Sequence, residues 1–188
     1  MKKSGIVKIV IIGIILAALV VGYFYYLSSK GKKNDEEVVQ STAIQAVLMR
    51  DLDKSYPPTP KEVVKYFNEI SKCFYNEKYT ESELYDLAMK IQEIYDDELV
   101  ANKSEDQYLK DLQSDIDDMK KQDRTISSYE LSASTDVEEF VENGYSCARL
   151  YCTYNVRQGT QMISSRTVFV LRKDDNGHWK ILGWDLDD

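Results

Sequence analysis

Residues 145–186 read YSCARLYCTYNVRQGTQMISSRTVFVLRKDDNGHWKILGWDL, and this stretch decides the fold class of the chain. Side chains alternate in character along 145–158, which is the period of a β-strand whose two faces differ. A short loop around Gly159 and a turn at 174–177, with Asp first and Gly fourth, divide the stretch into three strands. Strands joined by such short connections pair antiparallel. We therefore predict an antiparallel sheet at the C-terminal end of the protein.

A further strand is predicted directly before this sheet. Residues 125–134, TISSYELSAS, favour a strand, and residues 135–143, TDVEEFVEN, favour a short helix that Gly144 would end. The sheet should therefore contain four strands. An antiparallel sheet of this kind must bury one face against other elements.

Four segments upstream carry apolar residues at the period of a helix. The first covers residues 39–52, and the proline-rich SYPPTP at 55–60 ends it. Each of the other three begins at a capping-box pattern, Ser or Thr followed three residues later by Glu or Gln. Their N-caps are Thr59, Thr80 and Ser104. The helix from Thr80 should include Tyr95 and extend toward Leu99. The sequence thus predicts an α+β fold with about four helices packed on a curved, four-stranded antiparallel sheet.

An uncharged stretch near the N-terminus predicts a membrane anchor. Residues 9–27, IVIIGIILAALVVGYFYYL, approach the length of about 20 residues that spans a bilayer. Aromatic residues gather at 23–26, where amphipathic rings settle at the headgroup level. A buried core helix would show a polar stripe. A cleavable signal peptide would have a shorter apolar region and a small-residue cleavage site. We therefore predict a single transmembrane helix.

The two flanks of this helix carry three lysines each, so lysine counts alone do not decide its orientation. The very short tail ahead of it is typical of a signal anchor with a cytoplasmic N-terminus. We predict a cytoplasmic tail at 1–8, the transmembrane helix at 9–27, a linker at 28–37 and an extracytoplasmic domain at 38–188. That domain should be helical over 38–122 and form the sheet over 124–188. The predicted location is the cell membrane.

The charge distribution excludes nucleic acid as a partner. The first 33 residues hold six of the 24 Lys and Arg residues and no acid, which leaves 18 basic residues against 32 acidic ones. The remainder therefore carries a net charge of −14. Such a domain is repelled by phosphates and by anionic lipid.

No residue pattern predicts catalysis, a cofactor or a bound metal. The one histidine, His178, follows the turn at 174–177 and so lies at a hairpin tip that is open to water. Cys147 and Cys152 fall on opposite faces of one strand and cannot pair. A disulfide between Cys73 and either of them stays open, and three buried free thiols are the favoured interpretation.

A ligand pocket is one hypothesis for the sheet. Tyr145, Arg149 and Tyr151 share a strand face, Arg166 could join them from the next strand, and Trp179 or Trp184 could close the pocket. Arginine among aromatic rings can hold a carboxylate or stack on a planar ligand. The alternative is that these rings cover the outer face of the sheet and Arg149 is solvated.

Three segments carry a resemblance to known families. YPPTPKEVVKYFNEI, STDVEEFVENGYSCARLYCTYNVRQGT and FVLRKDDNGHWKILGWDL resemble an uncharacterised family of membrane-anchored Firmicutes proteins with a domain of unknown function. The order of helices and strands ending in GHWKILGW also resembles the nuclear transport factor two-like superfamily. That resemblance implies a sheet wrapped around helices as a cone with an internal cavity. Neither resemblance implies a catalytic residue.

Two functions follow as hypotheses. The first is a non-catalytic module on the outside of the cell that binds or scaffolds an envelope protein or a small ligand. The alternative is a cone-fold enzyme that acts on a small apolar ligand by acid–base chemistry in a pocket between sheet and helices. A deep cavity lined by a desolvated Asp or Glu beside Tyr would favour the enzyme.

Overall fold

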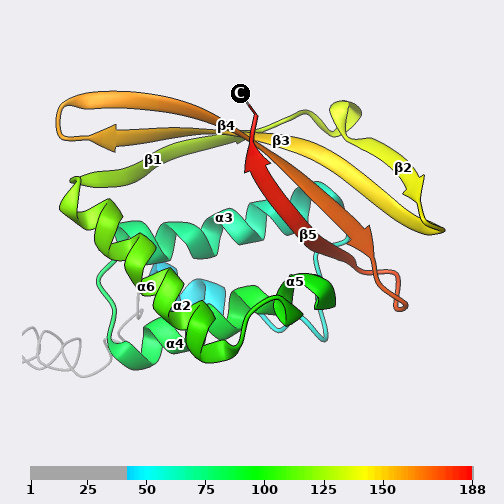
Figure 1. Ribbon diagram of the computed structural model, residues 1–188, viewed down its shortest axis with the longest axis horizontal. Helices are drawn as coiled ribbons and strands as arrows, with labels where there is room; N and C mark the ends of the chain where they lie inside the picture. Colours follow the sequence, from blue (N-terminus) through cyan, green and yellow to red (C-terminus); the bar gives the residue numbers. More distant parts are fainter. Residues whose placement is uncertain (1–41, 188) are drawn as a thin grey trace, which may run out of the picture. The chain divides into compact units, whose positions relative to one another are not determined.

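The computed structural model describes residues 42–187, in which five helices lie on one face of an antiparallel sheet (Figure 1). The α-helices are α2 Ala43–Leu48, α3 Pro60–Asn76, α4 Glu81–Gln92, α5 Asp97–Ala101 and α6 Glu105–Lys121. The strands are β1 Arg124–Leu131, β2 Glu138–Glu142, β3 Tyr145–Gln158, β4 Gln161–Lys173 and β5 Trp179–Leu186. The predicted α+β class and the antiparallel sheet are therefore confirmed.

Strand β3 is the centre of the sheet. The order is β1-β3-β4-β5, and β2 also pairs with β3. Strand β1 pairs with the second half of β3 and β2 with its first half, so these two strands share one edge of β3. Alternate residues of β3 face the helices, and Ala148, Leu150 and Cys152 are fully buried there.

The short helix predicted at 135–143 is wrong, and the sheet has five strands rather than four. A 3-10 turn at Ser134–Asp136 precedes β2, which pairs with β3 as a hairpin. Asn143 and Gly144 form its turn with φ values of +53° and +87°. Positive φ at both central residues is the geometry of the type I′ hairpin turn, for which Asn-Gly is the preferred pair. Gly144 therefore reverses the chain in a hairpin instead of ending a helix.

Replacing Gly144 by Ala should lower the free energy of unfolding by about 1–2 kcal/mol, because a Cβ is strained at positive φ. Gly183 in β5 is the matched control. A Cβ would meet nothing within 4 Å at either position, but Gly183 has no positive φ. Urea unfolding should show Gly183→Ala unchanged within about 0.5 kcal/mol. Equal effects of the two substitutions would contradict the turn assignment.

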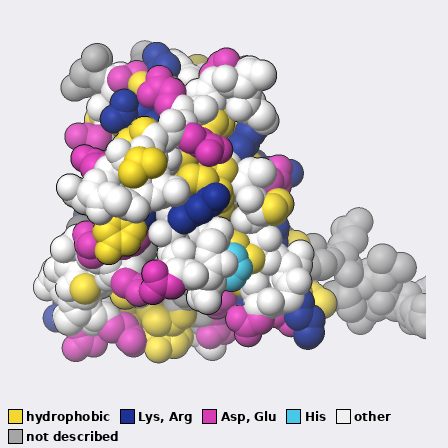
Figure 2. Space-filling view, turned by 90° about the vertical axis from the view of Figure 1, so that its right-hand side faces the viewer, with side chains coloured by type: hydrophobic (Ala, Val, Ile, Leu, Met, Phe, Trp, Pro, Cys, Tyr) yellow, Lys and Arg dark blue, Asp and Glu magenta, His cyan; other side chains and the backbone are white. Residues whose placement is uncertain are grey.

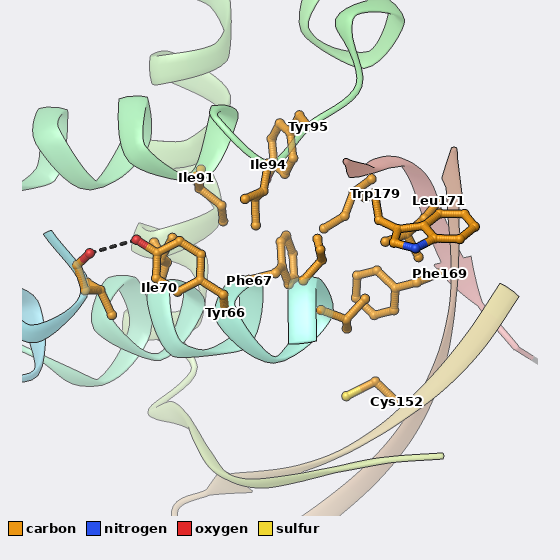
Figure 3. Close-up of a cluster of buried hydrophobic side chains, with 14 of the residues drawn as sticks. Tyr66, Phe67, Ile70, Ile91, Ile94, Tyr95, Cys152, Phe169, Leu171 and Trp179 are labelled. Carbon is orange, nitrogen blue, oxygen red and sulfur yellow. Dashed lines mark hydrogen bonds between the residues drawn. The ribbon is translucent and has the colours of Figure 1, made fainter. Parts of the chain in front are cut away.

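Helix α3 lies between the sheet and the layer of α2 and α4 (Figure 1). Five apolar residues at helical spacing on one side of this helix are buried: Val63, Val64, Phe67, Ile70 and Phe74. Its opposite side is buried as well, since Tyr66 is 0 % exposed and donates a hydrogen bond of 2.7 Å to the Val47 carbonyl (Figure 3). Phe67 points from α3 toward Phe169 of the sheet (Figure 3). The core thus surrounds α3.

The helix that begins at Thr80 ends earlier than predicted. Helix α4 stops at Gln92, and the chain then runs along the edge of β5. The Ile181 amide donates to the Ile94 carbonyl at 2.8 Å, and the Asp96 amide donates to the Ile181 carbonyl at 2.9 Å. These hydrogen bonds to β5 replace the hydrogen bonds that would continue the helix. Asp96 then caps α5 by accepting a hydrogen bond from the Glu98 amide.

The predicted tail, transmembrane helix and linker (1–8, 9–27 and 28–37) lie outside the described residues. Within residues 42–187, no helix combines the length and the apolar character needed to cross a bilayer.

Candidate functional site

A cleft of about 450 Å³ lies between the helices and one end of β5. Helices α3, α5 and α6 provide most of its walls, the end of α4 adds to them, and β5 contributes Trp184. The side chains that line its apolar part are Phe67, Phe74, Tyr75, Ile91, Tyr95, Leu99, Val100, Tyr108, Leu112 and Trp184. The break between α4 and α5 places Tyr95 and Leu99 on this wall.

Packed aromatic rings hold one wall of the cleft in place. The Trp184 ring lies 5.1 Å from that of Phe67 and 5.6 Å from that of Tyr95, centroid to centroid. The Phe169 ring packs against two of these rings, with centroids 5.2 Å from that of Phe67 and 6.1 Å from that of Trp184. Trp184 remains 45 % exposed, although its neighbours Phe67 and Tyr95 are buried. Its ring is therefore a preformed apolar surface that a ligand could cover.

Three tyrosines add hydroxyl groups to the cleft. Burial raises the pKa of Tyr95 well above its usual value, and a side-chain hydrogen bond with Tyr108 adds to this shift. Burial also raises the pKa of Tyr75 and that of Tyr108 to about 12. At neutral pH these hydroxyls stay protonated. They can therefore orient a ligand by neutral hydrogen bonds but do not act as bases there.

Charged side chains surround the opening of the cleft. They are Lys103, Glu105, Asp111 and Asp115. Lys103 forms an ion pair with Asp111, which also accepts a hydrogen bond of 2.7 Å from the side-chain amide of Gln107. Burial raises the pKa of Asp115, and repulsion by Asp111 adds to the shift. The charge of Asp115 in turn helps to raise the pKa of Tyr75, which lines the same cleft.

Comparison with known proteins assigns the chain to a family. A family model described as a domain of unknown function, DUF6715, matches residues 1–184. The chain belongs to the DUF6715 family. The match confirms the predicted membership of an uncharacterised family over nearly the whole DUF6715 chain. No curated protein is significantly similar to it.

The residues of the predicted sheet pocket divide between the two faces of the DUF6715 sheet. Tyr145, Arg149, Tyr151 and Arg166 lie on the face away from the helices, opposite the buried Leu150 of β3 and Phe169 of β4. Trp184 pairs with the buried Phe169, and Trp179 is 4 % exposed within the core. Both tryptophans therefore lie on the helix side. Trp184 lines the cleft described above, and the structure does not bring the six residues together.

The arginines of the outer face contact their own neighbours. Arg166 lies over the Tyr151 ring at 4.1 Å and forms an ion pair with Asp187 at 3.2 Å. Arg149 contacts Glu138 at 3.5 Å. Figure 2, which views the molecule from the right-hand end of Figure 1 and not onto this face, shows acidic, basic and apolar side chains mixed on the surface. The outer face thus matches the alternative interpretation, in which rings and arginines cover a sheet surface.

His178 packs on the loop between α2 and α3. Its ring stacks on Tyr56 with centroids 4.2 Å apart, and the Tyr56 hydroxyl donates a hydrogen bond of 2.9 Å to the Trp179 carbonyl. The nearest acid, Asp174, lies 3.7 Å from Nδ1. His178 thus joins the β4–β5 hairpin to the proline-rich loop. Within residues 42–187, no group of three or more His, Cys, Asp and Glu residues is arranged to hold a metal ion.

The three cysteines are free and buried in the DUF6715 structure. Burial raises the pKa of Cys73 to about 11, and it also raises the pKa values of Cys147 and Cys152. Since the thiolate is the reactive form, these side chains should react slowly while the protein is folded.

We expect iodoacetamide at pH 8 to label none of the three cysteines of the native protein within minutes and all three after unfolding in urea. Mass spectrometry of the intact chain measures the number of labels. Rapid labelling of the native chain would show that one of the thiols is accessible and ionised, in contradiction to their burial.

Sequence reasoning missed most of the cleft. Tyr95 was predicted only as part of a helix, and Tyr108, Asp111 and Asp115 were not singled out. The signal that could have found them is the repeated placement of Tyr on the apolar stripes of the helices. Tyrosine carries a hydroxyl that needs a partner or water, so several on one stripe can mark an incompletely filled interior.

Proposed function

We propose that the protein is a single-pass membrane protein whose domain outside the cell binds a small, largely apolar molecule in the cleft between α3, α5 and α6. The aromatic lining of this cleft of about 450 Å³ carries the proposal. Ligand sites are typically concave, mostly apolar and about 300–1,000 Å³ in volume, with a few polar groups that fix orientation. The predicted anchor at 9–27 supports the location, and the net charge of the domain holds it away from anionic lipid.

The test uses the neutral fluorophore N-phenyl-1-naphthylamine with the full-length chain. A bound probe should become brighter and should accept energy from Trp184, which lines the cleft. Val100→Phe should weaken binding at least about tenfold, because the larger ring fills the opening. Val141→Phe is the matched control, since Val141 is an exposed residue of β2 that does not line the cleft. Absence of binding, or equal binding by both variants, would refute the proposed site.

One observation favours acid–base catalysis as a second candidate function. Asp115, whose pKa is raised by burial, lies in the same cleft as the protonated hydroxyl of Tyr75. A carboxyl of raised pKa beside a proton donor is a common catalytic arrangement. Cell-extract metabolites can be incubated with the protein and with Asp115→Asn, and the products compared by mass spectrometry. Conversion by the unmodified protein alone would support the enzyme, whereas recovery of an unchanged bound molecule would support the binding module.

The proposal also includes the cone architecture of the domain and its location at the cell surface. Helices that precede a meander of long strands support the cone architecture of the nuclear transport factor two-like superfamily. The resemblance to membrane-anchored Firmicutes proteins supports a cell-surface location. An envelope protein as the partner remains the alternative to a small ligand.

A further inference from the structure

The charges around the cleft are unbalanced. Three carboxylates line it, those of Glu105, Asp111 and Asp115, against the single ammonium group of Lys103. That ammonium group is bound to Asp111, so it is already neutralised. Two negative charges therefore remain beside an apolar interior. Opposite charges attract more strongly near a low-dielectric wall than in open water.

Asp115 is the acid best placed to meet a ligand. Within residues 42–187 its carboxylate makes no side-chain hydrogen bond or ion pair, whereas the Glu105 carboxylate accepts a hydrogen bond of 3.1 Å from the Tyr85 hydroxyl. Partial burial and the nearby Asp111 carboxylate raise the pKa of Asp115. A positive charge in the cleft would stabilise the ionised carboxylate of Asp115.

The aromatic rings of the cleft also attract a cation. Trp184 presents a half-exposed indole beside Phe67 and Tyr95, and all three line the cleft. The faces of such rings carry a negative quadrupole and bind ammonium groups, with Trp the strongest, and quaternary ammonium ligands are often held between several rings. Neutral tyrosine hydroxyls do not oppose a cation.

We propose that the ligand of the cleft is a small organic cation with an apolar body, such as an aryl or alkyl amine or a quaternary ammonium compound. The inference rests on the proposed function, because it specifies the ligand class for the same cleft. The cation covers the Trp184 ring, and the carboxylate of Asp115 neutralises its charge.

Two isosteric probes separate charge from shape. They are 4-hydroxyphenyltrimethylammonium and 4-tert-butylphenol, in which a carbon atom replaces the charged nitrogen. Calorimetric titration of the full-length chain in a neutral detergent should give at least about tenfold tighter binding of the cation. Asp115→Asn should weaken binding of the cation about three- to tenfold and leave the neutral probe unaffected. Asp117→Asn is the matched control, since Asp117 lies on the same helix but does not line the cleft.

A second measurement follows the carboxyl group of Asp115 by NMR titration. The cation should lower the pKa of Asp115, because a nearby positive charge favours the ionised form, whereas the neutral probe should raise it by excluding water.

The outcomes distinguish this inference from the proposed function. Equal or tighter binding of the neutral probe would overturn the cationic ligand while leaving an apolar binding site intact. An unchanged affinity of Asp115→Asn for the cation would also overturn it. Failure of both probes, together with failure of the naphthylamine probe, would overturn the proposed function as well.

Discussion

Replacing Asp96 by Asn should lower the free energy of unfolding by about 2–3 kcal/mol, because it breaks the largely buried ion pair with Arg172 and leaves that guanidinium with the exposed Glu98 as its remaining charged partner. Two hydrogen bonds join the pair, from Nε to Oδ2 at 2.9 Å and from Nη2 to Oδ1 at 2.5 Å. The side chains are 5 % and 16 % exposed. This bidentate ion pair joins the segment between α4 and α5 to β4. Asn remains an acceptable N-cap for α5, so the substitution removes the ion pair and retains the cap.

The control for this prediction is Glu138→Gln, which breaks the solvent-exposed pair with Arg149. Exposed pairs contribute less than about 1 kcal/mol. Urea unfolding followed by tryptophan fluorescence measures both variants. If Asp96→Asn lowered the free energy of unfolding no more than Glu138→Gln, the buried ion pair between Asp96 and Arg172 would have no special role in stability.

Replacing Phe169 by Ala should cost about 3–5 kcal/mol, because it removes a large side chain from a site that cannot collapse. Phe169 is 0 % exposed, and its ring packs against those of Phe67 of α3 and Trp184 of β5. The same substitution should weaken binding of the naphthylamine probe in the cleft, since the Phe169 ring supports those of Phe67 and Trp184, which line the cleft. Chemical unfolding and the naphthylamine titration test the two effects separately.

Val168 is the matched control for Phe169. It is the preceding residue of β4 and lies on the opposite, outer face of the sheet, where it is only partly buried. Val168→Ala should cost about 1 kcal/mol or less and leave probe binding unchanged. Comparable effects at the two positions would contradict the assignment of the faces of β4.

Local signals explain why much of the fold could be predicted. The N-caps expected at Thr59, Thr80 and Ser104 are all present, and at Thr80 the reciprocal bond from the Thr80 amide to Glu83 completes the capping box. A cap is decided by residues within one turn, so the sequence contains all of its chemistry. The alternation along β3 likewise predicted which residues share a face of the strand. The Asn-Gly turn was also a local signal, but Gly144 was interpreted as a helix end.

The cleft could not be predicted in this way, because contacts between distant residues create it. The sequence by itself determined the starts of the three capped helices, the long antiparallel strands, the acidic charge of the domain and the opposite faces of Cys147 and Cys152. The tertiary structure decided where α4 ends, since Ile94 and Asp96 bond to Ile181, 85 or more positions away along the chain. It also decided that Trp184 meets Tyr95 and Phe67. Hydrophobic periodicity specifies which side of an element is buried, but it does not specify which distant residues that side will contact.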